Sequence, residues 1–299
     1  MSLIKHLTFI SCWGLIFCAC NRPPAGFYET KAVENVPYVT RDGQKLLVDL
    51  YLPTNAQGPR PAVVLFHGGG WTIGNRTMER DLARFLASMG YVGATAQYRL
   101  CGKNIHHPVP VQDALAAVKF LRSNAAEYGI DPERIAAGGE SAGGHLALLL
   151  ALARDHSIFK DDSFPGVSSE VSAAIDIYGP TDLAPAYKGG SWMVKWFLDS
   201  YLGGPPEKFA EVYKEAAPLT YARGDAPPVL IVHGDRDNMV GYQQHAEKLH
   251  KAIRDAGGRC QLVRVTGAGH GWGFDFTSNT SMRTLPAITQ FLARVFPDN

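Results

Sequence analysis

Short apolar runs without polar interruption recur along the chain, and turn-forming residues bound them. Residues 61–66 read PAVVLF before Gly68, and residues 228–233 read PVLIVH. A short run with no polar alternation is typical of a strand that is buried on both faces of a sheet. Similar runs predict further strands at residues 45–52, 91–97, 134–139, 171–178 and 260–266.

The segments between these strands have the period of amphipathic helices. In residues 111–128, Val111, Leu115, Val118 and Leu121 recur at steps of three and four residues, and a glycine follows. Further helices are expected at residues 78–89, 141–154, 241–256 and 286–295. Buried strands that alternate with helices predict an α/β fold, with a mostly parallel sheet and helices on both faces. In such sheets ligands bind beyond the carboxyl ends of the strands, so chemistry is expected in the loops that follow them.

Residues 183–225 interrupt this alternation. They hold Trp192, Trp196 and other aromatic residues between glycines and prolines. We interpret the segment as an insertion that forms a small lid over the site. An ordinary helical excursion packed on the surface is the alternative.

The N-terminus is expected to lie outside the fold. Residues 7–19 form an uncharged apolar run that is too short for a permanent membrane span and has the shape of an export signal. A small residue precedes Cys20 at the end of this run, which resembles a bacterial lipobox and predicts lipidation of Cys20. The expected organisation is a signal peptide over 1–20, a linker over 21–35 and one domain over 36–299. The protein is then exported and anchored by a lipid in the bacterial envelope, or secreted after plain signal cleavage.

Composition and motif content narrow the range of partners. The 299 residues are 46% hydrophobic, and 29 basic residues nearly balance 28 acidic ones. Without a basic stripe, nucleic acid is not an expected partner. His245 and His250 suggest a zinc helix, but histidines five residues apart point to different faces. Dinucleotide and phosphate-loop motifs are absent from the sequence, so we expect neither a metal nor a cofactor; the oligomeric state stays open.

Residues 139–143, with the sequence GESAG, follow an expected strand and open an expected helix. A sharp strand-to-helix turn lifts a serine hydroxyl clear of the backbone, and small residues two positions away relieve the crowding. The helix N-terminus also favours developing negative charge. We therefore interpret Ser141 as a nucleophile, with a glycine-rich packing turn as the alternative.

A glycine-rich loop with the sequence HGGGW occupies residues 67–71, directly after the expected strand at 61–66. Glycines allow the main chain to approach the oxyanion of a tetrahedral intermediate without side-chain clash. The backbone N–H groups of Gly69, Gly70 and Ala142 are therefore the predicted oxyanion hole.

Two later loops hold candidates for the remaining catalytic groups. Residues 233–237 read HGDRD, and the glycine-rich loop GAGHGW at residues 267–272 holds His270. We favour Asp237 as the acid that orients His270, because it lies further into its loop. Asp235 is the alternative, although its place suits binding to backbone amides of the turn. The order Ser, Asp, His along the chain matches α/β-hydrolases.

Together these motifs resemble the bacterial carboxylesterases of the α/β-hydrolase superfamily. The runs YRL at 98–100, AAEYGIDPERI at 125–135 and YGPTDL at 178–183 add to the resemblance, which extends over residues 36–296. Within the superfamily the chain is similar to the branch related to feruloyl and acetylxylan esterases, near the hormone-sensitive lipase-like esterases. Glu140 stands where hormone-sensitive lipase-like enzymes usually carry Asp, and the chain lacks room for their longer N-terminal cap.

The resemblance has consequences for structure and substrate. It implies the α/β-hydrolase fold with an eight-stranded sheet, and a strand order that keeps Cys101 and Cys260 apart as free thiols. Together with export, it suggests acetylated or feruloylated sugars as substrates. Trp71, Trp272 and His145 are candidate substrate-binding residues, with packing in the core as the alternative for each.

The predicted function is therefore hydrolysis of short-chain or carbohydrate esters through an acyl-enzyme on Ser141, with His270 as base and then acid. A peptidase or amidase with the same triad, of prolyl oligopeptidase-like or aryl formamidase-like type, is the alternative activity. A non-catalytic binding module is the third hypothesis. The sequence leaves the acyl chain and the alcohol open.

Overall fold

A computed structural model describes residues 28–154, 156–272 and 279–297. The predicted signal peptide over 1–20, with Cys20 as the lipidation site, lies outside the described residues. Among those described, no helix combines the length and the apolar character that a membrane span requires.

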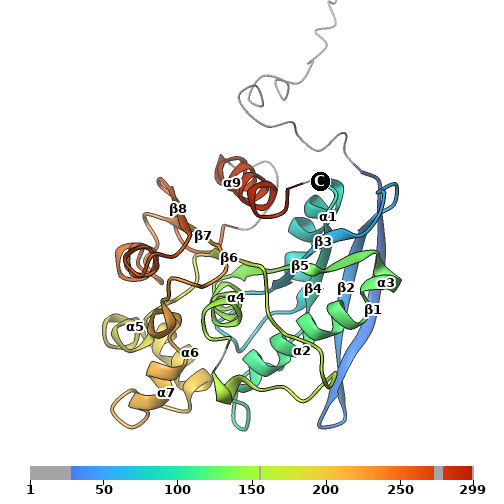
Figure 1. The fold of residues 1–299 in the computed structure, drawn as a ribbon. Helices are drawn as coiled ribbons and strands as arrows, with labels where there is room; N and C mark the ends of the chain where they lie inside the picture. Colours follow the sequence, from blue (N-terminus) through green and yellow to red (C-terminus); the bar gives the residue numbers. More distant parts are fainter. Residues whose placement is uncertain (1–27, 155, 273–278, 298–299) are drawn as a thin grey trace, which may run out of the picture.

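Eight strands form one mixed sheet in the order β1-β2-β4-β3-β5-β6-β7-β8 (Figure 1). The strands are β1 (Thr30–Arg41), β2 (Gln44–Pro53), β3 (Arg60–Phe66), β4 (Val92–Ala96), β5 (Ile130–Glu140), β6 (Ala173–Ile177), β7 (Val229–Gly234) and β8 (Cys260–Val265). β2 pairs antiparallel with β1 and β4, and the remaining pairs are parallel. The predicted eight-stranded, mostly parallel sheet is confirmed.

Helices cover both faces of this sheet (Figure 1). The α-helices are α1 (Arg80–Ser88), α2 (Val109–Ser123), α3 (Ala125–Tyr128), α4 (Ala142–Leu152), α5 (Leu183–Gly189), α6 (Trp192–Leu202), α7 (Ala210–Glu215), α8 (Lys248–Asp255) and α9 (Asn279–Val295). Shorter turns of helix are the 3-10 turns η2 (Arg76–Glu79), η3 (Ser157–Phe159) and η4 (Pro218–Tyr221) and the π-helical turn η5 (Gln243–Glu247). Helices α1 and α9 pack on one face, and α2, α4 and α8 pack on the other.

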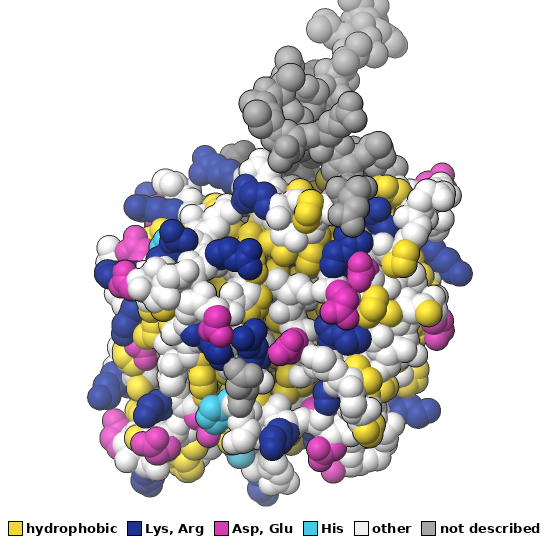
Figure 2. All heavy atoms as spheres, in the orientation of Figure 1, with side chains coloured by type: hydrophobic (Ala, Val, Ile, Leu, Met, Phe, Trp, Pro, Cys, Tyr) yellow, Lys and Arg dark blue, Asp and Glu magenta, His cyan; other side chains and the backbone are white. Residues whose placement is uncertain are grey.

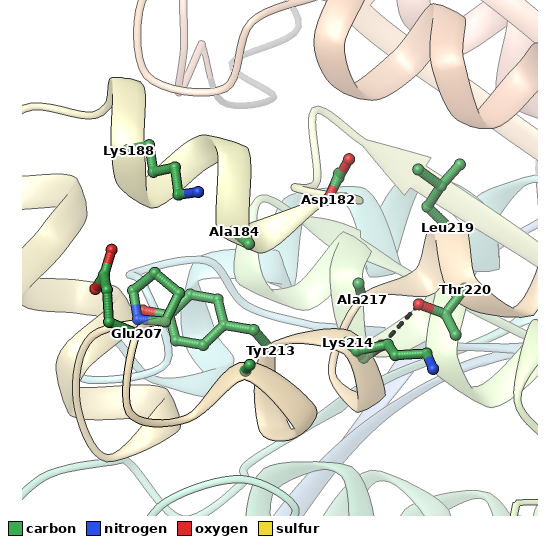
Figure 3. Close-up of a pocket in the computed structure, with 11 residues that line it drawn as sticks. Asp182, Ala184, Lys188, Glu207, Tyr213, Lys214, Ala217, Leu219 and Thr220 are labelled. Carbon is green, nitrogen blue, oxygen red and sulfur yellow. Dashed lines mark hydrogen bonds between the residues drawn. The ribbon is translucent and has the colours of Figure 1, made fainter.

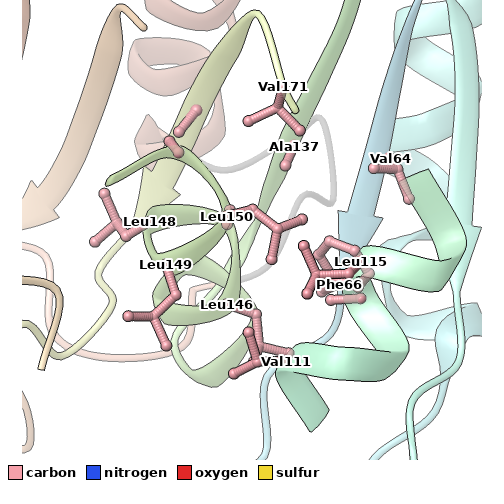
Figure 4. Packing of buried hydrophobic residues seen from close by; sticks show 14 of the residues in the cluster. Val64, Phe66, Val111, Leu115, Ala137, Leu146, Leu148, Leu149, Leu150 and Val171 are labelled. Carbon is pink, nitrogen blue, oxygen red and sulfur yellow. The ribbon is translucent and has the colours of Figure 1, made fainter. Parts of the chain in front are cut away.

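Each face of the sheet has its own hydrophobic core, and β3 contributes to both. Val63 and Leu65 belong to the core beneath α1 and α9, whereas Val64 and Phe66 belong to the core around α2 and α4. Figure 4 shows the second of these cores, with Leu115 of α2 among its members. Because both faces are covered, β3 reads as a continuous apolar run. Burying each such side chain stabilises the fold by roughly 1.5–3 kcal/mol.

The edge strand β1 begins at Thr30, so the end of the predicted 21–35 linker belongs to the sheet. Of the residues in β1, Tyr38 alone is classed as buried. An edge strand with this much exposure does not need an apolar face, which explains why the hydrophobic pattern did not reveal it.

Helix α9 begins at Asn279, seven residues before the predicted start at Pro286. The prediction placed Pro286 in the first turn, where proline is favoured. A proline inside a helix costs about 3 kcal/mol. Leu285, Ile288 and Leu292 are buried against the sheet, and each contributes roughly 1.5–3 kcal/mol, so packing outweighs the proline.

The insertion between β6 and β7 contains α5, α6, α7 and η4, which lie together at the lower left of Figure 1. Val194 and Leu198 of α6 are buried, whereas Trp192 is 80% exposed. The insertion predicted at residues 183–225 is therefore a helical layer with one face packed on the domain.

On the molecular face that Figure 2 draws, basic and acidic side chains are interspersed, as expected for a balanced charge.

Candidate active site

The turn between β5 and α4 holds Ser141 in a strained conformation, with φ 51° and ψ −114°. A Cβ atom on Gly139 or on Gly143 would overlap with the carbonyl oxygen of Phe66. This close packing explains why glycine stands two positions to either side of the serine. The N–H of Ser141 donates to the carbonyl of Ile177 over 2.8 Å, which attaches the turn to the neighbouring strand β6.

Three loops bring a hydroxyl, an imidazole and a carboxylate together. Nε2 of His270 lies 3.0 Å from Oγ of Ser141, and Nδ1 of His270 lies 2.7 Å from Oδ2 of Asp237. An ionised carboxylate only accepts hydrogen bonds, so Nδ1 carries the hydrogen and Nε2 is free to accept the serine proton. The structure thus places these three residues as nucleophile, base and acid require.

The side chain of Asp237 is buried, and both of its carboxylate oxygens have hydrogen-bond partners. Its Oδ1 accepts the N–H groups of Met239 and Val240 over 2.9 and 2.8 Å, and Nε2 of His233 lies 3.3 Å from Oδ2. Burial raises the pKa of Asp237, but hydrogen bonds from His233 and His270 outweigh it and hold the pKa well below its usual range. Asp237 is therefore ionised at neutral pH, as a group that stabilises an imidazolium must be.

Asp235, the alternative acid, has other partners. Its Oδ1 accepts the N–H of Gly267 over 2.7 Å, and its Oδ2 accepts from Arg264 over 3.0 Å. The Gly267 amide and the Arg264 guanidinium lower the pKa of Asp235. Asp235 therefore ties down the start of the loop that carries His270, and it is Asp237 that contacts the imidazole.

The HGGGW loop takes a path that depends on glycine. Gly69 has φ 105° and Gly70 has φ 56°. A Cβ atom on Gly69 would overlap with the carbonyl oxygen of Ile73, and one on Gly70 would overlap with the ring of Phe197. Gly70 lines the same cavity as Ser141 and Ala142, and Ala142 stands at the N-terminus of α4. Two of the three predicted oxyanion residues thus border this cavity, and Gly69 precedes Gly70 in the loop.

Aromatic contacts hold this loop in place. The hydroxyl of Tyr98 donates to the carbonyl of His67 over 2.9 Å, and the two rings stack with centroids 4.3 Å apart. Trp71 stacks on Tyr201 of α6 at 4.2 Å, and its carbonyl accepts the N–H of Cys101 over 2.8 Å. The YRL run and the insertion thus both support the loop.

His107 contacts two residues of the insertion, one of which is the Tyr201 that supports the HGGGW loop. Its neighbours in the sequence do not indicate this role. Its Nδ1 lies 2.9 Å from the hydroxyl of Tyr201, and its Nε2 lies 3.0 Å from Oε1 of Glu215. Burial lowers the pKa of His107 to about 3 and raises the pKa of Glu215. The imidazole is therefore neutral at neutral pH and fixes the Tyr201 ring that stacks on Trp71.

Comparison with known proteins assigns this arrangement to a family. The model of the BD-FAE family matches residues 48–253. The chain belongs to the BD-FAE family. This match confirms the predicted relationship to esterases of the α/β-hydrolase superfamily.

Named relatives of this BD-FAE member are esterases. Esterase LipQ of Mycobacterium tuberculosis is 29% identical over 88% of this chain, and the probable carboxylic ester hydrolase LipM of the same organism is 31% identical over 80%. The chain spans 62% of the length of LipQ and 55% of the length of LipM. The solved esterase Est2 of Thermogutta terrifontis has a TM-score of 0.75 and 30% identity, and the match covers 90% of this chain and 92% of Est2.

A cavity of about 50 Å³ lies beside Ser141 in this BD-FAE member. Its apolar walls include Trp71, Val194, Phe197, Leu198, Met239 and Val240. Sequence reasoning did not assign the members from α6 to the site. In the sequence these residues are recognisable only as apolar positions of a short helix. Such a pattern does not distinguish the wall of a pocket from the hydrophobic core.

The other predicted substrate-binding residues lie elsewhere. His145 is fully buried against Trp71, and its Nε2 lies 2.7 Å from the carbonyl of Ala216. Burial lowers the pKa of His145 to about 3, so it is a neutral packing residue, as in the alternative given for it above. Trp272 packs edge-on against Tyr178 with ring centroids 4.4 Å apart. Of the three candidates, it is Trp71 that borders the cavity.

A wider cavity of about 420 Å³ lies over α5 and α7 (Figure 3). Figure 3 shows the side chains of Lys188, Glu207 and Tyr213 around it. Among the described residues that line this cavity, there is no serine, histidine or cysteine. Ser141, by contrast, lines the smaller cavity.

His245, Cys101 and Cys260 are further side chains whose chemistry could involve a metal ion or a thiolate. Residues 28–154, 156–272 and 279–297 contain no group of three or more His, Cys, Asp or Glu that could hold a metal ion. In His245, which with His250 suggested a zinc helix, Nδ1 accepts the N–H of Thr181 over 3.0 Å. Cys101 and Cys260 are free thiols, and burial raises the pKa of each to about 12, so neither is a thiolate at neutral pH.

Proposed function

We propose that this BD-FAE member hydrolyses carboxylic esters of short acyl chains through an acyl-enzyme on Ser141. One observation carries the proposal: the hydrogen-bonded chain that runs from Asp237 through His270 to Ser141. That chain serves acyl transfer because it removes the serine proton at the moment of attack.

The reaction follows from these positions. Nε2 of His270 takes the proton of Ser141, and Oγ attacks the ester carbonyl. The oxyanion that forms is stabilised by backbone N–H groups of Gly69, Gly70 and Ala142, of which Gly70 and Ala142 border the cavity. The imidazolium then protonates the leaving alcohol, and water releases the acid from the acyl-enzyme by the same steps. Asp237 stabilises the imidazolium in both halves of the reaction.

The size of the cavity supports a short acyl chain. The cavity beside Ser141 is small, at about 50 Å³, and its walls are mostly apolar. A small apolar cavity favours acetyl or propionyl groups over a feruloyl group. Est2 has been solved with propionate bound and with butyrate bound, at 30% identity to this chain. We therefore favour acetylated over feruloylated compounds, carbohydrate acetates included, as substrates.

A panel of p-nitrophenyl esters, from acetyl to octanoyl, tests the proposal beside a feruloyl ester, acetylated xylan and a peptide p-nitroanilide. Each methylene that a pocket cannot hold costs roughly tenfold in kcat/KM, so acetyl or propionyl esters should exceed octanoyl esters by about 100-fold or more. Ser141→Ala should abolish this turnover. Cleavage of the anilide without turnover of any ester would favour the peptidase or amidase alternative. Binding of esters without turnover would favour a binding module.

We also propose that the protein is exported and carries a lipid on Cys20. The sequence pattern of residues 7–20 supports this proposal. In a bacterial host, the wild-type protein should incorporate labelled palmitate and sediment with membranes. Cys20→Ser should lose the label and become soluble. A wild-type protein that is processed but unlabelled would show plain signal cleavage.

A further inference from the structure

The histidine that suggested a zinc helix, His245, borders the same cavity as Ser141. It belongs to the π-helical turn η5 and is 3% exposed. Single turns of π-helix occur frequently at functional sites. The other walls of the cavity are mostly apolar, so the imidazole of His245 is a polar ring in an apolar lining. The mechanism above gives this ring no role.

Backbone groups hold the imidazole of His245 in one orientation and one tautomer. Its Nδ1 accepts the N–H of Thr181 over 3.0 Å and the N–H of Asp182 over 3.3 Å. The hydroxyl of Thr181 donates to the carbonyl of His245 over 3.0 Å. Burial lowers the pKa of His245 to about 4, so the ring is neutral at neutral pH. A neutral imidazole has one acceptor and one donor nitrogen, and since Nδ1 is the acceptor, Nε2 carries the hydrogen.

The Nε2–H of His245 is a donor without an acceptor. Among the described residues, no group accepts a hydrogen bond from it. The fully buried side-chain nitrogens that lack a partner include Nε1 of Trp71 but not Nε2 of His245, so Nε2 is accessible. An N–H without an acceptor in apolar surroundings is costly, and a ligand that brings an acceptor atom removes this cost. The donor therefore suits a polar atom of whatever enters the cavity.

We propose that His245 is a substrate-binding residue, whose Nε2–H donates a hydrogen bond to an oxygen atom within the acyl group of the ester. The preferred substrates are then esters of short acyl groups that carry an ether, hydroxyl or keto oxygen, rather than all-carbon chains of the same length. Such selection is expected of a mostly apolar pocket with one placed donor, because an all-carbon chain leaves the N–H unpaired. This inference rests on the proposed function, since it concerns the acyl cavity of the same site.

Two p-nitrophenyl esters of equal chain length test this preference. The methoxyacetyl and butyryl groups differ only at one position, which is an oxygen in the first and a methylene in the second. Dividing kcat/KM of each ester by its rate constant for hydrolysis by hydroxide removes the difference in intrinsic reactivity. On this scale the wild type should prefer the methoxyacetate by about threefold to tenfold, which is the range that one neutral hydrogen bond supplies.

Two changes at His245 separate binding of the substrate from support of the fold. In His245→Asn, Oδ1 can replace Nδ1 as the acceptor of the Thr181 N–H, but the shorter side chain has no donor at the place of Nε2, so the preference for methoxyacetate should disappear. The amide of His245→Gln reaches further and should recover part of the preference. His250→Asn is the matched control and should keep the wild-type preference, because His250 is not among the described residues that line the cavity. If His245 only supported the fold, all four proteins would have the same preference.

A binding measurement without turnover separates this inference from the proposed function. In NMR titrations, Ser141→Ala should bind ethyl methoxyacetate more tightly than ethyl butyrate, and the addition of His245→Asn should remove the difference. Thermal unfolding of each variant verifies that it is folded. Equal preference with and without His245→Asn, in kinetics or in binding, would overturn the inference. Absence of ester turnover in the wild type would overturn the proposed function alone.

Discussion

The strand-end loops and the insertion over them form the site in different ways. Ser141 follows β5 directly, and Asp237 lies in the loop after β7, so both are attached to central strands of the sheet. Phe197 and Leu198 reach the same cavity from α6, which attaches to the domain by packing. The chemistry is therefore encoded by short local motifs, whereas the fit of the substrate depends on tertiary packing.

This difference indicates which region of the chain sets the preference for the acyl group. The insertion contacts the HGGGW loop through Tyr201, which stacks on Trp71, and His107 joins the insertion to the rest of the domain through Glu215. Changes in α6 can reshape the cavity without moving the strand ends. Substitutions in the loops should therefore affect rate or folding, and substitutions in α6 should affect acyl preference.

The largest expected effect separates the two aspartates of one loop. Asp237→Asn removes the carboxylate that orients His270, and kcat should fall by about 10⁴-fold, as such changes do in serine hydrolases. Asp235→Asn, the matched control, should stay within about tenfold, because Asp235 binds Gly267 and Arg264 instead. Steady-state kinetics with p-nitrophenyl acetate measures both. The reverse ranking would make Asp235 the catalytic acid.

The next effect tests how tightly the strand-end turn is packed. A Cβ atom in Gly143→Ala would overlap with the carbonyl oxygen of Phe66, so the free energy of unfolding should fall by about 3 kcal/mol or more. Gly189→Ala, in α5 of the insertion, has open space for its methyl group and should change stability by less than about 1 kcal/mol. Urea denaturation measures both. Equal stability of the two variants would contradict the contrast between the regions.

Beneath the loops, Asp176 of β6 should make stability depend on pH. Burial raises the pKa of Asp176 to about 6, even though His233 and the Gly179 N–H lower it. This pKa is above the unfolded value of about 4. Asp176 should therefore lower the free energy of unfolding of the wild type by about 3 kcal/mol as the pH rises from 4 to 6, with no further change above pH 6. Asp176→Asn should therefore be the more stable protein at pH 8 but not at pH 4. Urea denaturation at the two pH values is the measurement, and a constant difference would contradict the prediction.

The smallest effect concerns the insertion. Phe197→Ala removes a ring from the cavity wall beside Gly70, so the ratio of octanoyl to acetyl kcat/KM should rise by about tenfold. Trp192→Ala, on the exposed side of the same helix, should leave that ratio within about twofold. An unchanged ratio in Phe197→Ala would mean that α6 does not set acyl preference.

Much of the sheet and the candidate catalytic residues could be predicted, because each rests on a local pattern. The buried strands β3 and β7 are continuous apolar runs, and Ser141 stands between glycines that its turn requires. The exposed strand β1 has no such pattern. Helix α9 continues through Pro286 only because its apolar face packs on the sheet.

The residues that sequence reasoning missed become important only through the fold. Glu79 is a charged residue in a polar stretch, and nothing local shows that its side chain is buried. Phe197 belongs to the insertion, and its distance from Ser141 along the chain hides their shared cavity. His145 was a candidate for substrate binding with packing as the alternative, and its contact with the carbonyl of Ala216 agrees with packing.

The most direct test of the account is to trap the acyl-enzyme. Rapid quenching of the wild type with p-nitrophenyl acetate, followed by peptide mass spectrometry, should find one acetyl group on Ser141 that appears with the burst of p-nitrophenol. Asp237→Asn should form this adduct far more slowly. Turnover of the ester with no acetyl group on Ser141, or with the group on another residue, would contradict the account.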